Sequence, residues 1–445
     1  MEMPISISIL PCLAIAGLVP ILFSSCRSTG SSPAVATDEP APVRIAANPA
    51  KISGTASLKE LVAFALQNQP EIHAAEARVR RMMAKVPQVA SLPDPKFKTS
   101  AGSMAETAAG RVEWMAGVEQ ALPFPGKLRE MAKAAGKDAE VAAAQLEAVQ
   151  LSVAAQVEQA YWNLYLALQT SSITRENQDA LKLIRESVDA RVAANKANQD
   201  DQLRLAAEAG RLENMLIVSQ RSEASARSRL NSLLNRPAGS PLPTPKFHHS
   251  GSRRDLKSLL ARAESQHPRV KAADAELQAF RHRLKRAELE GYPDFFLGAQ
   301  HAAVANSGLA PSANGRDQLF ATVGISIPLW QAPRRAMIDE AQAGIEEASA
   351  KIGTARANLR YEVEDAWLRA KATEDLITLF EKQILPESKQ AFDGVLTGFA
   401  AGEQDFVDSI DSWRQLLGFQ LQQAGNEAEL GKALAALRKS TGTKL

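Results

Sequence analysis

The chain contains the stretch LKELVAFALQNQP at Leu58–Pro70 and a second version of it, LKSLLARAESQHP, at Leu256–Pro268. The two stretches lie 198 positions apart. Farther along, VEQAY at Val157–Tyr161 returns as VEDAW at Val363–Trp367, only eight positions later than that spacing requires. Self-similarity of this kind is the signature of a repeat architecture. The sequence therefore predicts two copies of one structural unit.

The two copies set the predicted domain boundaries. We predict a first structural repeat at residues 57–236, a linker at residues 237–254, where prolines and glycines gather, and a second repeat at residues 255–445. Each repeat shows a short helix, a helix that ends at a proline-rich corner, a strand pair and a long helical hairpin. The strand pairs are expected at about 96–122 and 294–328, so the fold should be mainly α with a small β part.

The strands and the first long helix have recognisable limits. In the first copy the strands are expected at Phe97–Gly102 and Val112–Leu122, and in the second at Phe295–Gln300 and Leu319–Ile327. Between Lys127 and Ala193 there is no proline, so a helix of roughly 65 residues is permitted. Its apolar residues recur with the mean spacing of a coiled coil.

The start of the chain has the features of an exported lipoprotein. Residues 1–25 are predicted to be a signal peptide, because an apolar run of suitable length is interrupted by two prolines. The run ends in Phe23-Ser24-Ser25-Cys26, which resembles a bacterial lipobox, so Cys26 is predicted to be acylated (a palmitate-type modification). An ordinary signal peptide with a chance cysteine is the alternative. Residues 26–56 then form a lipidated flexible tether.

The order of these elements resembles the outer-membrane efflux protein family typified by TolC. The resemblance runs from about Ser57 to Gly442 and is carried by five groups of residues: Asn68–Pro70, Gln266–Pro268, Tyr292–Asp294, Gly324–Trp330 and Gly398–Asp411. The run Pro125-Gly126-Lys127 before a long helix is similar to members of the heavy-metal efflux branch.

This resemblance implies a homotrimer in the outer membrane. Long coiled-coil hairpins would form an α-helical barrel in the periplasm, topped by a shared transmembrane β-barrel with four strands per subunit. The assembly would passively carry substrates outward as the duct of a tripartite efflux system, with a periplasmic adaptor protein and an inner-membrane pump as partners. The alternative is the adaptor itself, which also has a lipid anchor and a long α-hairpin; a purely structural periplasmic coiled coil is a second rival.

The turn of the second hairpin is the candidate functional site. Gly402 is expected at the turn because it tolerates positive φ, and Asn195 is its counterpart in the first copy. The family implies that Asp408 and Asp411, which share a helix face, form carboxylate rings at a periplasmic gate. The alternative is that these two aspartates are solvated or lie near a helix N-terminus.

The same comparison also raises a question about the gate. Family members often have Tyr where this chain has Phe399 and Arg where it has Gln404. A latch of hydrogen bonds to groups such as Asp201 is therefore not expected here. The resemblance also implies that the residues of the two turns contact the adaptor protein: Asn195, Asp201, Phe399, Gly402 and Gln404.

Composition excludes several other function classes. The net charge of +2 comes from acids and bases mixed along the chain, so no nucleic-acid partner is expected. The six histidines show no zinc-protease or nucleophile motif, so neither an enzymatic activity, a cofactor nor a metal site is predicted. Its two cysteines, Cys12 and Cys26, lie at the start, so the mature chain has no internal disulfide.

Overall fold

The computed structural model describes residues 52, 54–101, 106, 107, 109–193, 198–247, 255–306 and 314–443. They belong to one compact unit, Asn48–Leu445. The predicted signal peptide, the lipidation site Cys26 and the turn residue Asn195 lie outside the described residues, as does most of the predicted tether.

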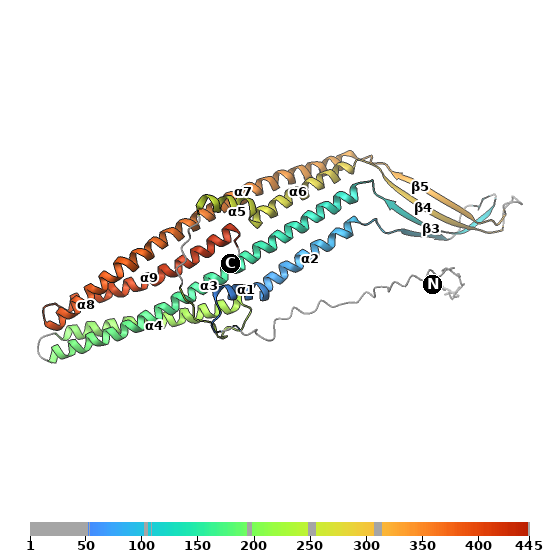
Figure 1. The fold of residues 1–445 in the computed structure, drawn as a ribbon. Helices are drawn as coiled ribbons and strands as arrows, with labels where there is room; N and C mark the ends of the chain where they lie inside the picture. The colour runs from blue at the N-terminus through green and yellow to red at the C-terminus, as the bar shows by residue number, and fades with distance from the viewer. Residues whose placement is uncertain are drawn as a thin grey trace, which may run out of the picture. The chain divides into compact units, whose positions relative to one another are not determined.

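Both repeats have the same order of main elements, apart from the small strand β2 in the first and the π-helical turn η1 in the second (Figure 1). The first contains α1 (Leu58–Asn68), α2 (Pro70–Ala90), β1 (Lys96–Ala101), the two-residue β2 (Glu106–Thr107), β3 (Gly110–Leu122), α3 (Lys127–Ala193) and α4 (Gln199–Leu233). The second contains α5 (Leu256–Gln266), α6 (Pro268–Leu289), β4 (Asp294–Val304), β5 (Gln318–Ser326), α7 (Gln331–Leu379), the π-helical turn η1 (Phe380–Ile384), α8 (Leu385–Ala401) and α9 (Phe406–Thr441). The mainly helical fold with a small antiparallel sheet is as predicted.

The short helices begin where the sequence supplies start signals. Ser57 and Glu60 form a capping box at α1, in which each side chain binds the backbone N–H of the other residue. Helices α2 and α6 both begin with proline, at Pro70 and Pro268, where the missing N–H costs nothing. The repeated motif that ends in proline is therefore the junction between two helices in each copy.

The helices form a wall in which α3 is central. Helix α3 packs against α2 and α6 on the side of the sheet, and against α4 and α9 toward the other end (Figure 1). Helix α7 packs against α6 and α9, and α8 packs against α9. Helices α2 and α4 therefore lie at one edge of the wall, and α7 and α8 lie at the other.

The four main strands form one antiparallel sheet in the order β1-β3-β4-β5. Strand β3 of the first repeat pairs with β4 of the second over ten residue pairs, among them Leu122 with Phe295 and Val112 with Val304. The small β2 pairs only with β3. Strands β1 and β5 are the outer strands, and each has one described neighbour.

Two of the four main strands, β3 and β4, are longer than the sequence pattern indicated, whereas β1 and β5 have the predicted length and begin one residue earlier. Strand β4 continues four residues past Gln300, and β3 starts two residues before Val112. The added residues of β4 include Ala302 and Ala303, whose small side chains give no alternating hydrophobic signal. Backbone pairing with β3 nevertheless holds them in the sheet.

A buried ion pair fixes the middle of the wall. Arg438 of α9 pairs with Glu158 of α3, a side chain that is 2% exposed. Burial raises the pKa of Glu158 despite the arginine. Around it, the apolar core includes Val157, Leu164 and Leu61.

Candidate functional site: the helical tip and the strand surface

The turn between α8 and α9 has the geometry that its glycine permits. Gly402 follows the last residue of α8 with φ of +84°, in the left-handed region. The N–H of Glu403 donates to the carbonyl of Gly398 at 2.8 Å. Any Cβ on Gly398 would come within 2.7 Å of the Gln404 side chain. Gln404 therefore folds back over its own turn.

Beneath this turn the two hairpins share one apolar cluster. It contains residues of α3, α4, α8 and α9, so both repeats contribute: Leu181, Ile184, Val188, Leu205, Leu212, Phe392, Phe399, Phe406, Ile410, Trp413, Leu416 and Leu417. Phe399 is 1% exposed and contacts Phe406, with 6.3 Å between the ring centroids. The side chain that replaces the family's Tyr is thus a core residue.

Two arginines connect the hairpins of one subunit at this cluster. Arg191 of α3 donates from Nη1 to the carbonyl oxygen of Phe399 at 2.8 Å, and its guanidinium lies 4.4 Å from the centre of the Phe399 ring. Arg414 of α9 donates to Glu208 of α4 at 2.7 Å and to Asp411 at 2.9 Å. The sequence pattern singled out neither arginine.

The two predicted gate aspartates differ in their surroundings. Asp408 is exposed in the first turn of α9, where the partial positive charge of the helix N-terminus favours a carboxylate. Asp411 lies one turn later and is paired with Arg414. The hydrogen bond to Glu208, and to a lesser extent the contact with Asp411, raise the pKa of Arg414 above its usual value. The structure thus brings Asp408 and Asp411 to one end of α9, but it partly neutralises Asp411.

Asp201 and Gln202 lie in the first turn of α4. Asp201 is half-buried, and among the described residues no hydrogen bond or ion pair joins it to Phe399 or Gln404. The neighbouring Gln202 instead donates to Asp189 of α3 at 2.7 Å.

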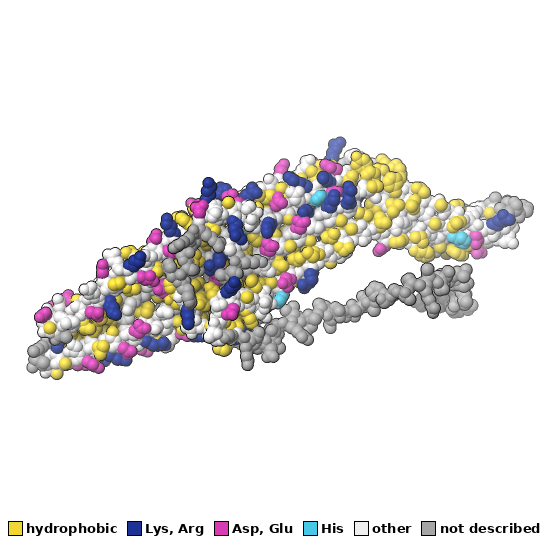
Figure 2. Space-filling view, viewed as in Figure 1, with side chains coloured by type: hydrophobic (Ala, Val, Ile, Leu, Met, Phe, Trp, Pro, Cys, Tyr) yellow, Lys and Arg dark blue, Asp and Glu magenta, His cyan; other side chains and the backbone are white. Residues whose placement is uncertain are grey.

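One face of the sheet is mainly apolar, and the other is mixed, with polar side chains beside the exposed Phe320. Because directly paired residues share a face, the register places these exposed apolar side chains together: Phe97, Trp114, Val118, Phe295, Leu297, Leu319, Val323 and Ile325. The opposite face carries Lys98, Glu119, Gln300 and Thr322, and Lys98 pairs with Glu119 at 2.8 Å. Figure 2 shows hydrophobic side chains over much of the strands and the adjoining helix ends.

Aromatic rings lie near both ends of this sheet. Phe124 and Tyr292 stack with 4.6 Å between centroids at the helix-facing end, and Trp114 contacts His301 at 5.4 Å toward the other end. Trp330, just after β5, is 78% exposed. Aromatic residues at the two ends of an apolar strand face are typical of membrane interfaces.

The Pro-Gly-Lys run has a structural role at this junction. Lys127 is 5% exposed in its side chain and binds Asp294 at 2.8 Å and Glu290 at 3.0 Å. Asp294 also accepts from the N–H of Phe124 at 2.6 Å. Lys127 therefore ties the start of α3 to the corner before β4, which accounts for this lysine without reference to any substrate.

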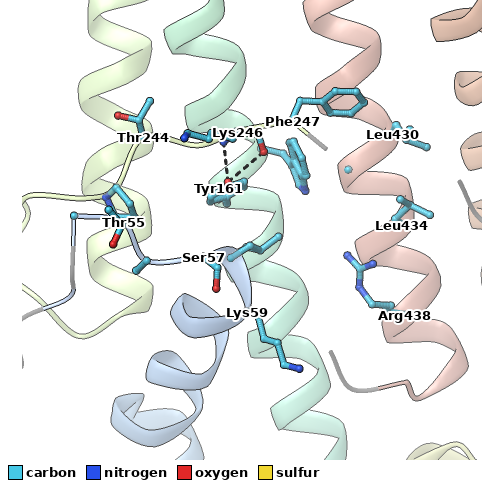
Figure 3. A pocket seen from close by; sticks show the side chains of 16 residues that line it. Thr55, Ser57, Lys59, Tyr161, Thr244, Lys246, Phe247, Leu430, Leu434 and Arg438 are labelled. Atoms are coloured by element: carbon cyan, nitrogen blue, oxygen red, sulfur yellow. Dashed lines mark hydrogen bonds between the residues drawn. The ribbon is translucent and has the colours of Figure 1, made fainter. Parts of the chain in front are cut away.

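A cavity of about 700 Å³ lies halfway along the wall (Figure 3). Its walls come from the segment before α1, from α3, from the inter-repeat linker and from α9. The hydroxyl of Tyr161 accepts from the N–H of Lys246 at 2.9 Å, which holds the linker against α3.

Among the described residues, no three His, Cys, Asp or Glu side chains gather as metal ligands. No helix within the described ranges of the chain has the length and hydropathy needed to cross a bilayer.

A helical wall that ends in an amphipathic antiparallel sheet is the architecture of an outer-membrane channel subunit. The sequence pattern of the outer membrane efflux protein family matches residues 61–236 and 259–443, one segment in each repeat. The chain belongs to this family. Efflux and an outer-membrane location with periplasmic helices, both predicted from the sequence, follow from this membership. The alternative assignment as an adaptor is not supported.

Individual relatives agree with the family. The chain is 23% identical over 412 residues to the cobalt-zinc-cadmium resistance protein CzcC of Cupriavidus metallidurans, covering 88% of this chain and 92% of that protein. The fold is similar to the outer-membrane channel OprN, with a TM-score of 0.74 and 22% identity over 89% of this chain and 96% of OprN. The open state of the Neisseria gonorrhoeae channel MtrE gives a TM-score of 0.71 and 19% identity, covering 89% and 94% of the two chains.

Proposed function

We propose that three copies of this chain form a passive export duct, in which each copy gives four strands to one closed β-barrel. The observation that carries the proposal is the sheet with two open edges, β1 and β5. Unpaired backbone groups are very costly in a bilayer, so an apolar-faced sheet must close on itself. Four strands are too few for the smallest membrane barrels, which have eight.

The strand directions allow this closure. In the antiparallel order β1-β3-β4-β5, the outer strands run in opposite directions. Strand β5 of one copy therefore meets β1 of the next copy in antiparallel orientation. Three copies give about twelve strands, an even number within the range of bacterial outer-membrane barrels.

The helical edges carry matching apolar side chains. Helix α4 exposes Leu203, Ile217 and Val218 on the side away from α3, and α7 at the opposite edge exposes Tyr361 and Leu368. Exposed apolar strips on edge helices are typical of a subunit interface. Since the two edges differ, each copy joins the next head to tail, which closes into a ring.

At the end of the tunnel away from the barrel, Asp408 and Asp411 would form the periplasmic gate. Three copies would place three exposed Asp408 carboxylates around one opening, where their field attracts cations and their repulsion opposes closure. Asp411 would add less charge, because Arg414 is bound to it. The turns at Gly402 and Asn195, with Asp201, Phe399 and Gln404, would lie at the contact with a periplasmic adaptor linked to an inner-membrane pump.

We further propose divalent metal cations as the cargo class to test first. The relative CzcC bears the name of a cobalt, zinc and cadmium resistance protein. An acidic mouth favours such ions, although no bound-metal site is needed in a duct. Cys26 acylation would add a lipid anchor to the barrel.

The assembly is tested by matched substitutions at two leucines that are both 64% exposed. Leu203→Glu changes the edge helix α4, whereas Leu183→Glu changes the central helix α3. Native mass spectrometry in detergent should show a trimer for the wild type and for Leu183→Glu, but a loss of trimer for Leu203→Glu. A wild-type monomer or dimer would contradict the duct.

A further inference from the structure

The helix ends next to the sheet continue the order of its strands. Strand β1 follows α2, β3 precedes α3, β4 follows α6 and β5 precedes α7. The strands lie in the order β1-β3-β4-β5, and the helices pack in the order α2-α3-α6-α7. Each face of the sheet therefore continues into one face of the helical wall, directly beyond the apolar strand surface.

Positive side chains gather on these helix ends. Figure 2 shows Lys and Arg side chains over the part of the wall next to the sheet, in the same view in which the strand surface is largely hydrophobic. Five exposed cations lie within the helical turns closest to the sheet, and we call them the basic collar: Arg129 and Lys133 of α3, Arg281 and Lys285 of α6, and Arg335 of α7.

The basic collar has few counter-charges within the chain. Glu130 is 6% exposed in its side chain and already accepts from Lys133 at 2.9 Å and from His282 at 2.7 Å. Arg281, Lys285 and Arg335 form no ion pair with any other residue that the structure describes. Arg281 and Lys285 are four residues apart on one helix face, where like charges repel each other. An external anion would remove this repulsion.

The collar lies at the depth of a lipid headgroup layer. Lys285 is four residues before the end of α6, and Arg335 is four residues after the start of α7. At 1.5 Å per residue, both lie about 6 Å from the sheet-side end of their helix. The headgroup layer on each side of a bilayer is on the order of 5–8 Å thick. Trp330, 78% exposed between β5 and α7, is placed to mark the boundary with the hydrocarbon.

We propose that the basic collar binds the phosphate groups of anionic phospholipids in the periplasmic leaflet of the outer membrane, in preference to zwitterionic lipids. This proposal rests on the proposed duct function, which places the strand surface in the hydrocarbon and the helices in the periplasm. Long Lys and Arg side chains reach toward headgroups while their stems stay on apolar surface. The collar recurs in each of three copies, so it would surround the barrel and fix its depth in the membrane.

The test measures lipid binding to detergent-purified trimers by native mass spectrometry. The probes are phosphatidylglycerol and phosphatidylcholine with the same acyl chains. The wild type should bind phosphatidylglycerol more tightly. Each cation near an anionic lipid surface contributes about fivefold in affinity, so Arg281→Gln/Lys285→Gln should weaken phosphatidylglycerol binding on the order of 25-fold. Its binding of phosphatidylcholine should not change, and Arg281→Lys/Lys285→Arg, which keeps both charges, should bind like the wild type.

The matched control removes the same two charges from α5. Lys257 and Arg262 are exposed on this helix, which lies midway along the helical wall (Figure 1). Lys257→Gln/Arg262→Gln should therefore keep the preference for phosphatidylglycerol. An equal loss in both double mutants, wild-type trimers without a lipid preference, or selective binding of lipid A in place of phosphatidylglycerol would overturn the proposal. A wild type that forms no trimer would instead contradict the duct itself.

Discussion

A single arginine placed on either face of β5 tests which face meets lipid. Val323 is 74% exposed on the apolar face and pairs with Leu297. It lies two residues from Ala321, which pairs with Ala299 at the middle of β4. An arginine near the bilayer midplane on the lipid face of a barrel costs about 2–4 kcal/mol. Val323→Arg in three subunits should therefore destabilise the trimer by about 6–12 kcal/mol.

The adjacent Thr322 provides the matched control. Its register partner Gly298 also pairs with Glu119, so Thr322→Arg faces the polar side within reach of a carboxylate. We expect this variant to assemble and melt close to the wild type. The assay is the amount of trimer extracted from outer membranes, followed by its thermal dissociation on semi-native gels. Normal assembly of Val323→Arg together with failure of Thr322→Arg would show that the two faces are assigned the wrong way round.

Three further predictions concern the gate, the buried ion pair and the lipid anchor. Asp408→Ala/Asp411→Ala trimers should lose cation preference and block by multivalent cations in planar bilayers; unchanged selectivity in a folded double mutant would leave these residues as helix-end carboxylates only. Arg438→Met leaves the buried Glu158 carboxylate unpaired and should cost about 3–5 kcal/mol at neutral pH. Because burial raises the pKa of Glu158, the folded chain holds a proton on this carboxyl group more tightly than the unfolded chain does. The contribution of Glu158 to stability is therefore lost as the pH rises. The melting temperature of Arg438→Met should accordingly come closer to that of the wild type in acid. Mass spectrometry should find acyl mass on a peptide that starts at Cys26, and an unmodified N-terminus elsewhere would contradict this.

The sequence predicted the elements better than their contacts. Helix α3 was expected over Lys127–Ala193 and has these limits, because coiled-coil spacing and the absence of proline act locally. The π-helical turn η1 was not expected, since no residue pattern in Phe380–Ile384 distinguishes it from an α-helix. The length of β4 was also underestimated, because its last residues include Ala302 and Ala303.

At the tip, spacing placed Asp408 and Asp411 on one helix face but gave no information about their partners. Arg414 reaches Glu208, 206 positions earlier, and Arg191 reaches Phe399, 208 positions later. Such pairs depend on how the two repeats dock, and neither arginine belongs to a local motif. The departure from Tyr at position 399 was visible in the sequence, but the arginine that contacts Phe399 was not.

The π-helical turn has a consequence for how the chain tolerates insertions. Helix α3 is anchored at both ends, by Lys127 on Asp294 and by Arg191 on Phe399. One inserted residue turns everything beyond it by about 100°, so α3 cannot change length and keep both anchors. A π turn, in contrast, absorbs an additional residue without breaking the helix. Among related chains, differences in helix length should therefore occur mainly in the consecutive segments α7, η1 and α8. The number of residues in α3 should stay constant.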